Sequence, residues 1–303
     1  MFRGVYSAAS GMIAAERRQQ MLTNRLANAE TPGYKQDEQV LRAFPEMLIE
    51  RIRDAQVNVQ GKPSFSGSTP IGTLYTGVYA QEAIPSFQQG DLQETGHPLH
   101  LAIVDQALPE NPETEERGTL FFAVQTGEDE VRYTRNGRLM LNAEGTLVTS
   151  EGYPVLNEDL EPIQVGQGAL QVLEDGTLIL HTADEAGGEE LGRLWIGYTE
   201  QPGRLVKEGN GVYRFVPENG ADPEAPEGEP QHIDGIAFLN DPEVEGAPGY
   251  EIRQGFLERS NVDPTRTMSD MLTMYRLYEA NQRVLQSYDR SMELAATQIG
   301  RLG

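Results

Sequence analysis

The chain has 303 residues, with 24 lysine and arginine side chains against 47 aspartates and glutamates, and a formal net charge of −23. A chain this acidic is poorly suited to nucleic acid, because basic side chains hold the phosphate backbone. The absence of cysteine excludes disulfides, thiol nucleophiles and cysteine metal sites. Near the start, the longest apolar stretch runs only from Met12 to Ala15, and no run of about 18 apolar residues follows, so neither a secretory signal nor membrane insertion is expected.

The charge is distributed unevenly along the chain. Residues 1–53 and 251–303 together hold 15 of the basic and 13 of the acidic residues, so the two ends carry +2. Residues 54–250 hold the other 9 basic and 34 acidic residues and carry −25. Nearly neutral ends can pack closely against copies of themselves, whereas a strongly acidic middle repels its copies and stays solvated.

The first predicted element is a helix from about Arg3 to Asn28, which ends at Thr31-Pro32-Gly33 because proline and glycine favour a turn. Small and apolar residues recur in it at alternating intervals of four and three. This heptad spacing gives one narrow stripe, as in the packing seam of a coiled coil. The stripe consists of Ala8, Met12, Ala15, Gln19, Leu22, Leu26 and Ala29.

The segment after this helix is expected to be a connector. A second short helix is predicted over about residues 38–53 from the spacing of Leu41, Phe44, Leu48, Ile49 and Ile52. Residues 61–77 are rich in glycine, serine, proline and threonine, which predicts an extended loop.

The stretch from about Leu99 to Pro217 is predicted to be β structure. Short runs of β-forming residues are separated by tight-turn dipeptides such as Asn136-Gly137 and Asp175-Gly176. Their even spacing favours an antiparallel sandwich or barrel. The predicted strands cover residues 120–126, 132–135, 138–142, 146–149, 170–173, 177–180, 194–198 and 212–216.

A short repeat flanks this β section. The pattern Gln-Gly-x-Leu-x-x-Ser/Thr occurs at residues 89–95 and again at residues 254–260. A chance match is one explanation. The interpretation we favour is that the chain leaves and re-enters a common base through two paired segments.

The last predicted helix starts at Asp263, a good N-cap, with Pro264 at the first helical position, and runs to about Ile299. It carries a second heptad seam. An ordinary helical bundle could also account for such spacing, but two seams at opposite ends of one chain favour a coiled coil. Polar residues inside the seams, Gln19 and Asn281, are of the kind that fixes register and partner number. The second seam consists of Met271, Met274, Tyr278, Asn281, Leu285, Tyr288, Met292, Ala295, Ile299 and Leu302.

Motifs for catalysis are weak. His97 and His100 are the one close histidine pair, and Pro98 between them argues against a metal-binding helix. With 47 acidic residues, carboxylate pairs arise by chance, so motifs alone leave a glycosidase open. We assign no catalytic, cofactor-binding or metal-ligating residue and expect no enzyme activity and no cofactor.

The predicted fold is α+β, a discontinuous coiled-coil unit of terminal helices with an inserted all-β middle domain, sandwich-like or barrel-like. The predicted domains are residues 1–35, the first core helix; 36–96, a connector; 97–249, an outward-facing β domain; 250–263, a return connector; and 264–303, the second core helix.

Distinctive motifs occur in three parts of the chain. The amino-terminal motifs are residues 7–12 (Ser-Ala-Ala-Ser-Gly-Met), 21–24 (Met-Leu-Thr-Asn) and 26–35 (Leu-Ala-Asn-Ala-Glu-Thr-Pro-Gly-Tyr-Lys); those of the middle are residues 121–126, 132–137 and 152–156; those of the carboxyl-terminal end are residues 255–263 (Gly-Phe-Leu-Glu-Arg-Ser-Asn-Val-Asp) and 278–282. These motifs resemble those of the flagellar basal-body rod and hook–basal-body protein family, most closely its rod-type members from Gram-positive bacteria. The likeness covers most of the chain.

The resemblance implies a structural subunit of the bacterial flagellar rod, exported by the flagellar type III apparatus without a cleaved signal peptide. Such a protein would be located in the basal body. Its partners would be copies of itself and other rod or hook proteins, polymerised through the terminal helices to transmit torque between motor and hook. The alternative is a cell-envelope β-domain protein that binds polysaccharide and oligomerises through its terminal helices. An exposed aromatic groove would favour this alternative, and Trp195, the single tryptophan, argues against it.

Overall fold

The computed structural model describes residues 2–45, 47–51, 69–74, 76–106, 108, 117–127, 130–166, 168–181, 188–216, 231–232 and 249–299. Two units are distinguished by their internal contacts. The helical unit comprises Met1–Leu26, Glu38–Ala83 and Pro264–Gly303, so three separate stretches of chain contribute to it. The β unit comprises Ala27–Asp37 and Ile84–Asp263.

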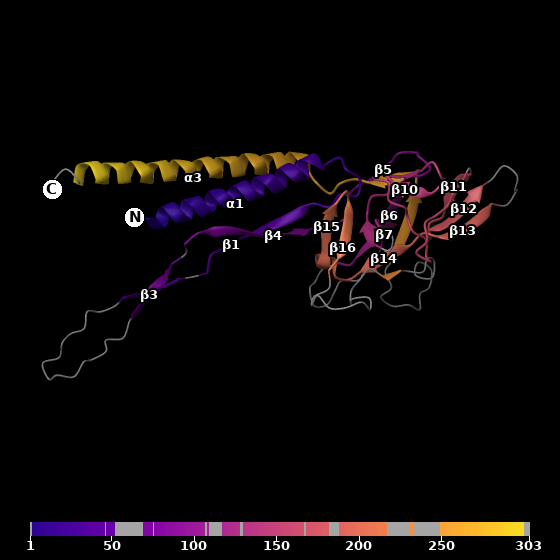
Figure 1. Cartoon of the computed structure of the whole chain (residues 1–303), viewed down its shortest axis with the longest axis horizontal. Coiled ribbons are helices and arrows are strands. Elements are labelled where there is room, and N and C mark those ends of the chain that lie inside the picture. Colours follow the sequence, from indigo (N-terminus) through magenta and orange to yellow (C-terminus); the bar gives the residue numbers. More distant parts are fainter. Residues whose placement is uncertain are drawn as a thin grey trace, which may run out of the picture. The chain divides into compact units, whose positions relative to one another are not determined.

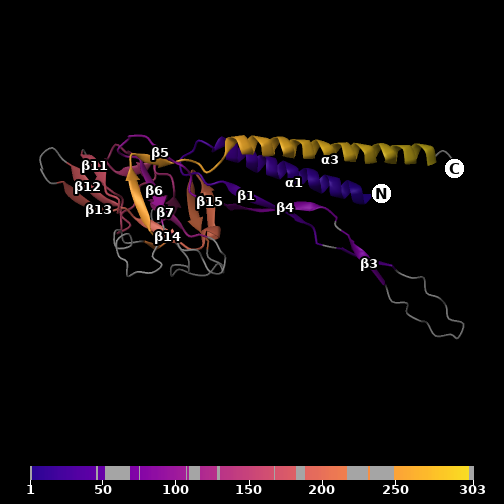
Figure 2. The ribbon, with the colours of Figure 1, turned by 180° about the vertical axis from the view of Figure 1, so that it is seen from behind.

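Both predicted terminal helices are confirmed. They are α1 (Phe2–Ala27) and α3 (Pro264–Ile299), which lie side by side in the helical unit (Figures 1 and 2). Gly4 lies against Tyr288 and Gly11 against Asn281, so contacts advance by seven residues in α1 as they step back by seven in α3. The two helices are therefore antiparallel and in heptad register. No helix of the described part of the chain is long and apolar enough to cross a membrane.

The predicted short helix over residues 38–53 is wrong. This segment forms β1 (Asp37–Ala43), which pairs with β4 (Val78–Pro85), and β2 (Met47–Arg51), which pairs with β3 (Thr69–Leu74). Exposure alternates along β1 with the period of two that a strand requires. Pro45, between the two strands, lacks the amide hydrogen that a helix interior needs. The predicted loop over 61–77 contains strand β3, while residues 61–68 and 75 lie outside the described part.

The β unit is built on antiparallel sheets, as predicted. Its largest sheet has six strands in the order β15-β16-β8-β7-β14-β17. A three-stranded sheet, β11-β12-β13, and the pairs β9–β10, β6–β18 and β5–β19 complete it. The strands are β5 (Leu92–Glu94), β6 (Leu101–Asp105), β7 (Thr119–Gln125), β8 (Val131–Thr134), β9 (Leu139–Leu141), β10 (Leu147–Thr149), β11 (Ala169–Val172), β12 (Thr177–His181), β13 (Glu189–Arg193), β14 (Ile196–Thr199), β15 (Leu205–Gly209), β16 (Val212–Phe215), β17 (Gln231–His232), β18 (Tyr250–Gln254) and β19 (Phe256–Glu258).

Strand β7 lies at the centre of the packing. Its alternate residues Leu120, Phe122 and Val124 enter one hydrophobic cluster, while Phe121 and Ala123 enter a second one on the opposite face. Because both faces are covered, β7 is a continuous apolar run rather than an alternating one. Burial on both faces holds β7, and with it the paired strand β8, in the core of the β unit.

The repeated Gln-Gly-x-Leu segments do pair. Strand β5, from the first copy, runs antiparallel to β19, from the second, with Glu258 opposite Leu92 and Phe256 opposite Glu94. The backbone amide of Thr95 also donates to the carbonyl of Gly255 (2.8 Å). The predicted pairing of the two repeated segments is therefore confirmed, and both segments lie within the β unit.

Candidate functional site

The predicted seam of α1 lies on the covered side of the helix. Ala8, Ala15 and Leu22 are buried, and Met12, Gln19 and Leu26 are half-buried. Ala29 is also buried, but it follows α1 and belongs to the β unit.

The predicted seam of α3 shows the same pattern. Between Thr273 and Ser291, nearly every residue that is not exposed belongs to the seam. Ile299 lies at the end of α3, and Leu302 lies outside the described residues. The half-buried seam residues are Met271, Met274, Tyr278, Asn281, Leu285, Tyr288, Met292 and Ala295.

Small residues let the two helices approach closely. A Cβ atom added to Gly11 would lie 2.9 Å from the side-chain nitrogen of Asn281, and the Tyr288 hydroxyl occupies the corresponding space at Gly4. The polar seam residue Asn281 thus packs within its own chain. Two residues of the α3 seam, Asn281 and Tyr288, therefore contact α1 of the same chain at Gly11 and Gly4. The use of the seam residues between subunits stays a prediction.

A second site lies in the β unit, where three motifs meet around buried charges. Glu258 of β19 accepts hydrogen bonds from Lys35 through Oε1 (2.5 Å) and from Arg135 through Oε2 (2.6 Å). All three side chains are at most 2% exposed. Lys35 follows α1, Arg135 follows β8 and Glu258 precedes α3, so segments 223 residues apart in sequence converge here. We call these three residues, with Asp105, the charged junction.

Backbone groups complete the charged junction. Arg135 donates to the carbonyls of Leu120 (2.7 Å) and Ile103 (3.0 Å) and to Oδ1 of Asp105 (2.7 Å). Further hydrogen bonds run from Lys35 to the Gln88 carbonyl (2.9 Å) and from the Gly90 amide to Glu258 (2.9 Å). Two cations and one anion are therefore buried together, with the half-buried Asp105 beside them, and they are largely satisfied, as buried charges require.

Burial and neighbouring charges shift the pKa values of Glu258, Arg135 and Lys35. Burial tends to raise the pKa of Glu258, but Arg135 and Lys35 outweigh it and the pKa falls below its ordinary 4.5. For Arg135, burial is outweighed by Glu258 and Asp105, so its pKa rises. For Lys35, burial prevails over the attraction of Glu258 and lowers the pKa. The charged form of Glu258 is therefore the native one at neutral pH.

The lowered pKa of Glu258 predicts a pH dependence of stability. Its contribution is fully present above the unfolded-state pKa near 4.5 and is lost as the pH falls through the lower folded-state value. Urea unfolding of the full chain between pH 3 and 7 should show this loss. Glu258→Gln should weaken the dependence below about pH 4.5. An identical slope in both proteins would contradict the assignment.

Close backbone contacts surround the charged junction. The amide of Gly33 donates to the Glu258 carbonyl (2.8 Å), and a Cβ added to Gly33 would lie 2.5 Å from the backbone of Arg135. One added to Gly90 would lie 2.0 Å from the Arg259 carbonyl oxygen. Only glycine permits such approach. The glycines of the Thr-Pro-Gly and Gln-Gly motifs are therefore explained by packing.

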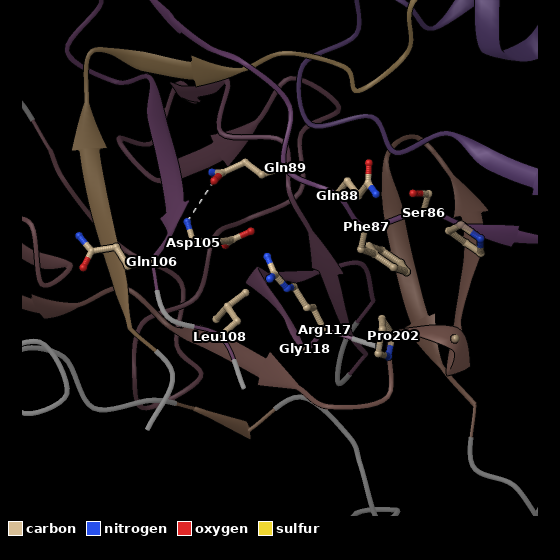
Figure 3. Close-up of a pocket in the computed structure, with 12 residues that line it drawn as sticks. Ser86, Phe87, Gln88, Gln89, Asp105, Gln106, Leu108, Arg117, Gly118 and Pro202 are labelled. Atoms are coloured by element: carbon tan, nitrogen blue, oxygen red, sulfur yellow. Dashed lines mark hydrogen bonds between the residues drawn. The ribbon is translucent and has the colours of Figure 1, made fainter. Parts of the chain in front are cut away.

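A pocket of about 750 Å³ opens beside this site (Figure 3). Polar residues that line the pocket hydrogen-bond to other parts of the fold. Asp105 pairs with Arg135, while Gln89 bridges the Asp105 amide and the Ile103 carbonyl. The remaining lining includes Phe87, which packs edge-on against Phe121.

The residues considered for other functions, His97, His100 and Trp195, make packing contacts or hydrogen bonds within the fold. The rings of His97 and His100 stack with their centroids 4.7 Å apart, and Thr95 hydrogen-bonds His100. Within the described ranges, no three histidine, cysteine, aspartate or glutamate side chains gather as a metal site. Trp195 is 6% exposed and packs against Tyr133, so it offers no platform for a sugar.

The antiparallel terminal helices and the inserted β unit, in which buried charges join three segments of the chain, define an α+β protein. Three family models match its parts: "Flagella basal body rod protein" over residues 5–35, "Flagellar hook protein FlgE/F/G D1 domain" over 117–179 and "Flagellar basal body rod FlgEFG protein C-terminal" over 253–298.

Full-length relatives agree with these matches. The chain is 37% identical to the flagellar hook–basal body complex protein FlhO of Bacillus subtilis, over all of both chains. It is 27% identical to the basal-body rod protein FlgG of Borreliella burgdorferi, over 97% of this chain and 98% of the other, and 27% identical to FlgF of Caulobacter vibrioides, over 100% and 99%. The chain belongs to the flagellar basal-body rod family. It is a structural, non-enzymatic subunit of the basal body and assembles with other rod or hook subunits.

Proposed function

We propose that copies of this subunit polymerise through α1 and α3 into part of the rod, and that torque passes from motor to hook through these packed helices. The observation that carries the proposal is the antiparallel, heptad-registered helix pair formed by the two ends of the chain. The nearly neutral ends support it, since they can pack where the acidic middle would repel.

The charged junction suits the same role. It joins the segment after α1, the segment before α3 and the centre of the β unit by short, buried, charge-assisted hydrogen bonds. Such bonds are stronger than neutral ones and fix geometry. Force on either connecting segment would therefore reach the β unit through ionic contacts as well as through the backbone. We further propose that copies reach this location through the flagellar type III export apparatus, and that neither nucleic acid nor membrane insertion is involved.

Removing the last helix tests the proposal. A strain that produces only residues 1–263 should be non-motile and should form no complete rod, because α1 then loses the helix that packs on it and the polymer contact is lost. The purified fragment should retain the thermal transition of the β unit. Full-length protein at the same expression level is the control. Normal swimming by the truncated strain would contradict the proposal.

A further inference from the structure

The two helices of the pair differ in length. α1 has 26 residues and α3 has 36. In the register set by the Gly4–Tyr288 and Gly11–Asn281 contacts, Phe2 lies about level with Arg290. Residues 292–299 therefore extend past the start of α1, and both ribbon views show this overhang (Figures 1 and 2). At about 1.5 Å per residue, the overhang is about 12 Å long.

The overhang continues the apolar seam. Met292 and Ala295 keep the heptad spacing of the seam, and Leu294 beside them is 50% exposed. Within the described residues, α1 supplies no residue level with them. Among the described residues, this end of α3 therefore has the chemistry of a helix-packing surface, but no part of α1 lies level with it.

A second apolar surface lies at the other end of α3. Met268, Leu272 and Tyr275 are spaced at i, i+4 and i+7, so they lie on one face, and they are 51%, 60% and 51% exposed. Met271 and Met274 between them are half-buried on the seam. The three exposed residues, which we call the amino-terminal stripe, therefore lie outside the contact with α1. Large apolar side chains gathered in this way mark an interaction surface.

We propose that the overhang of one subunit docks on the amino-terminal stripe of a second copy. The inference rests on the proposed function and assigns residues to the polymer contact. Leu272 and Ala295 are about 35 Å apart along one helix at about 1.5 Å per residue. A head-to-tail contact between two different patches extends into a filament when its rotation does not close, whereas reciprocal pairing of the same patches would give only a dimer. A copy of the chain fits as the occupant, because both patches are apolar and belong to its nearly neutral ends.

Disulfide trapping tests this contact, because the natural chain contains no cysteine. The full-length Leu272→Cys/Leu294→Cys variant should be expressed in place of the natural protein. Oxidation of isolated basal bodies should then give a ladder of cross-linked multimers of this chain. The matched control is Thr273→Cys/Leu294→Cys. Its first cysteine is only one residue further along α3 than Leu272, but it points about 100° away around the helix axis. The control should give no ladder.

The outcomes separate this inference from the proposed function. Protein present in basal bodies without a ladder, or cross-linked only to a different protein, overturns the docking inference and leaves the rod assignment intact. Protein absent from basal bodies even in its natural form contradicts the rod assignment.

A second variant keeps the inference testable if the cysteine variants assemble poorly. Leu272→Lys should lower incorporation into basal bodies by about tenfold or more, because docking would bury an unpaired charge. The melting temperature of the purified protein should not change. Thr273→Lys should incorporate normally. Normal incorporation of Leu272→Lys would overturn the inference.

Discussion

Replacing Glu258 with glutamine should destabilise the β unit by about 3–5 kcal/mol, since Lys35 and Arg135 would then be buried without their shared counter-ion. For a unit of this size, that corresponds to a fall of roughly 6–20 °C in melting temperature. Differential scanning calorimetry of the full chain would measure it. The substitution keeps the side chain's shape, so the effect reports the lost charge rather than lost packing.

The matched control is Glu251→Gln. Glu251 of β18 pairs with Arg253, whose side chain is 43% exposed, and exposed ion pairs contribute little. This variant should melt close to the natural protein. Equal effects of the two substitutions would mean that the charged junction contributes no more than a surface ion pair.

Replacing Gly33 with alanine should be strongly destabilising, by about 3 kcal/mol or more. Gly33 has φ +68°, which costs a non-glycine residue about 1–2 kcal/mol. The added Cβ would also lie 2.5 Å from the backbone of Arg135, which cannot move without disturbing the charged junction. Urea unfolding of the full chain would measure the change in the free energy of unfolding.

Gly96→Ala separates the two contributions. Gly96 has nearly the same φ, +66°, but nothing lies within 4 Å of its added Cβ. The free energy of unfolding of Gly96→Ala should therefore fall only by the backbone cost of about 1–2 kcal/mol. If both alanine variants lost the same stability, close packing of Gly33 on Arg135 would play no part.

The terminal helices could be predicted because their signals are local. Asp263-Pro264 marks the start of α3, and the four-three spacing identifies the face that the helix pair covers. The eight predicted strands are all present for the same reason, because alternation and turn dipeptides are written in adjacent residues. Local spacing could not show which helix covers the seam. The heptad spacing is the same whether the partner helix belongs to the same chain or to another subunit.

The connector was harder to predict because its apolar residues fit two periods. Leu41, Phe44 and Leu48 satisfy a helical spacing, yet pairing of β1 with β4, more than 30 residues away, decides the structure. Strands β6 and β18 likewise depend on a partner nearly 150 residues distant. Long-range pairing of this kind overrides local propensity.

The charged junction was also not predicted. Lys35, Arg135 and Glu258 each resemble an ordinary surface residue, because lysine, arginine and glutamate are rarely buried fully. Their motifs contributed to the family resemblance, but only the folded chain brings the three motifs together. A signal was present in the glycines nearby, Gly33 and Gly90, whose close backbone contacts indicate a tightly packed site.

Locating this chain in isolated basal bodies is the most direct test that it is a subunit of the rod. An epitope inserted between β12 and β13, far in sequence from both helices, would be labelled with gold-conjugated antibody and imaged by electron microscopy. We expect label on the rod, between the cell membrane and the hook, and none in a strain that produces only residues 1–263. Label scattered over the cell wall, or recovered only in the soluble fraction, would contradict it.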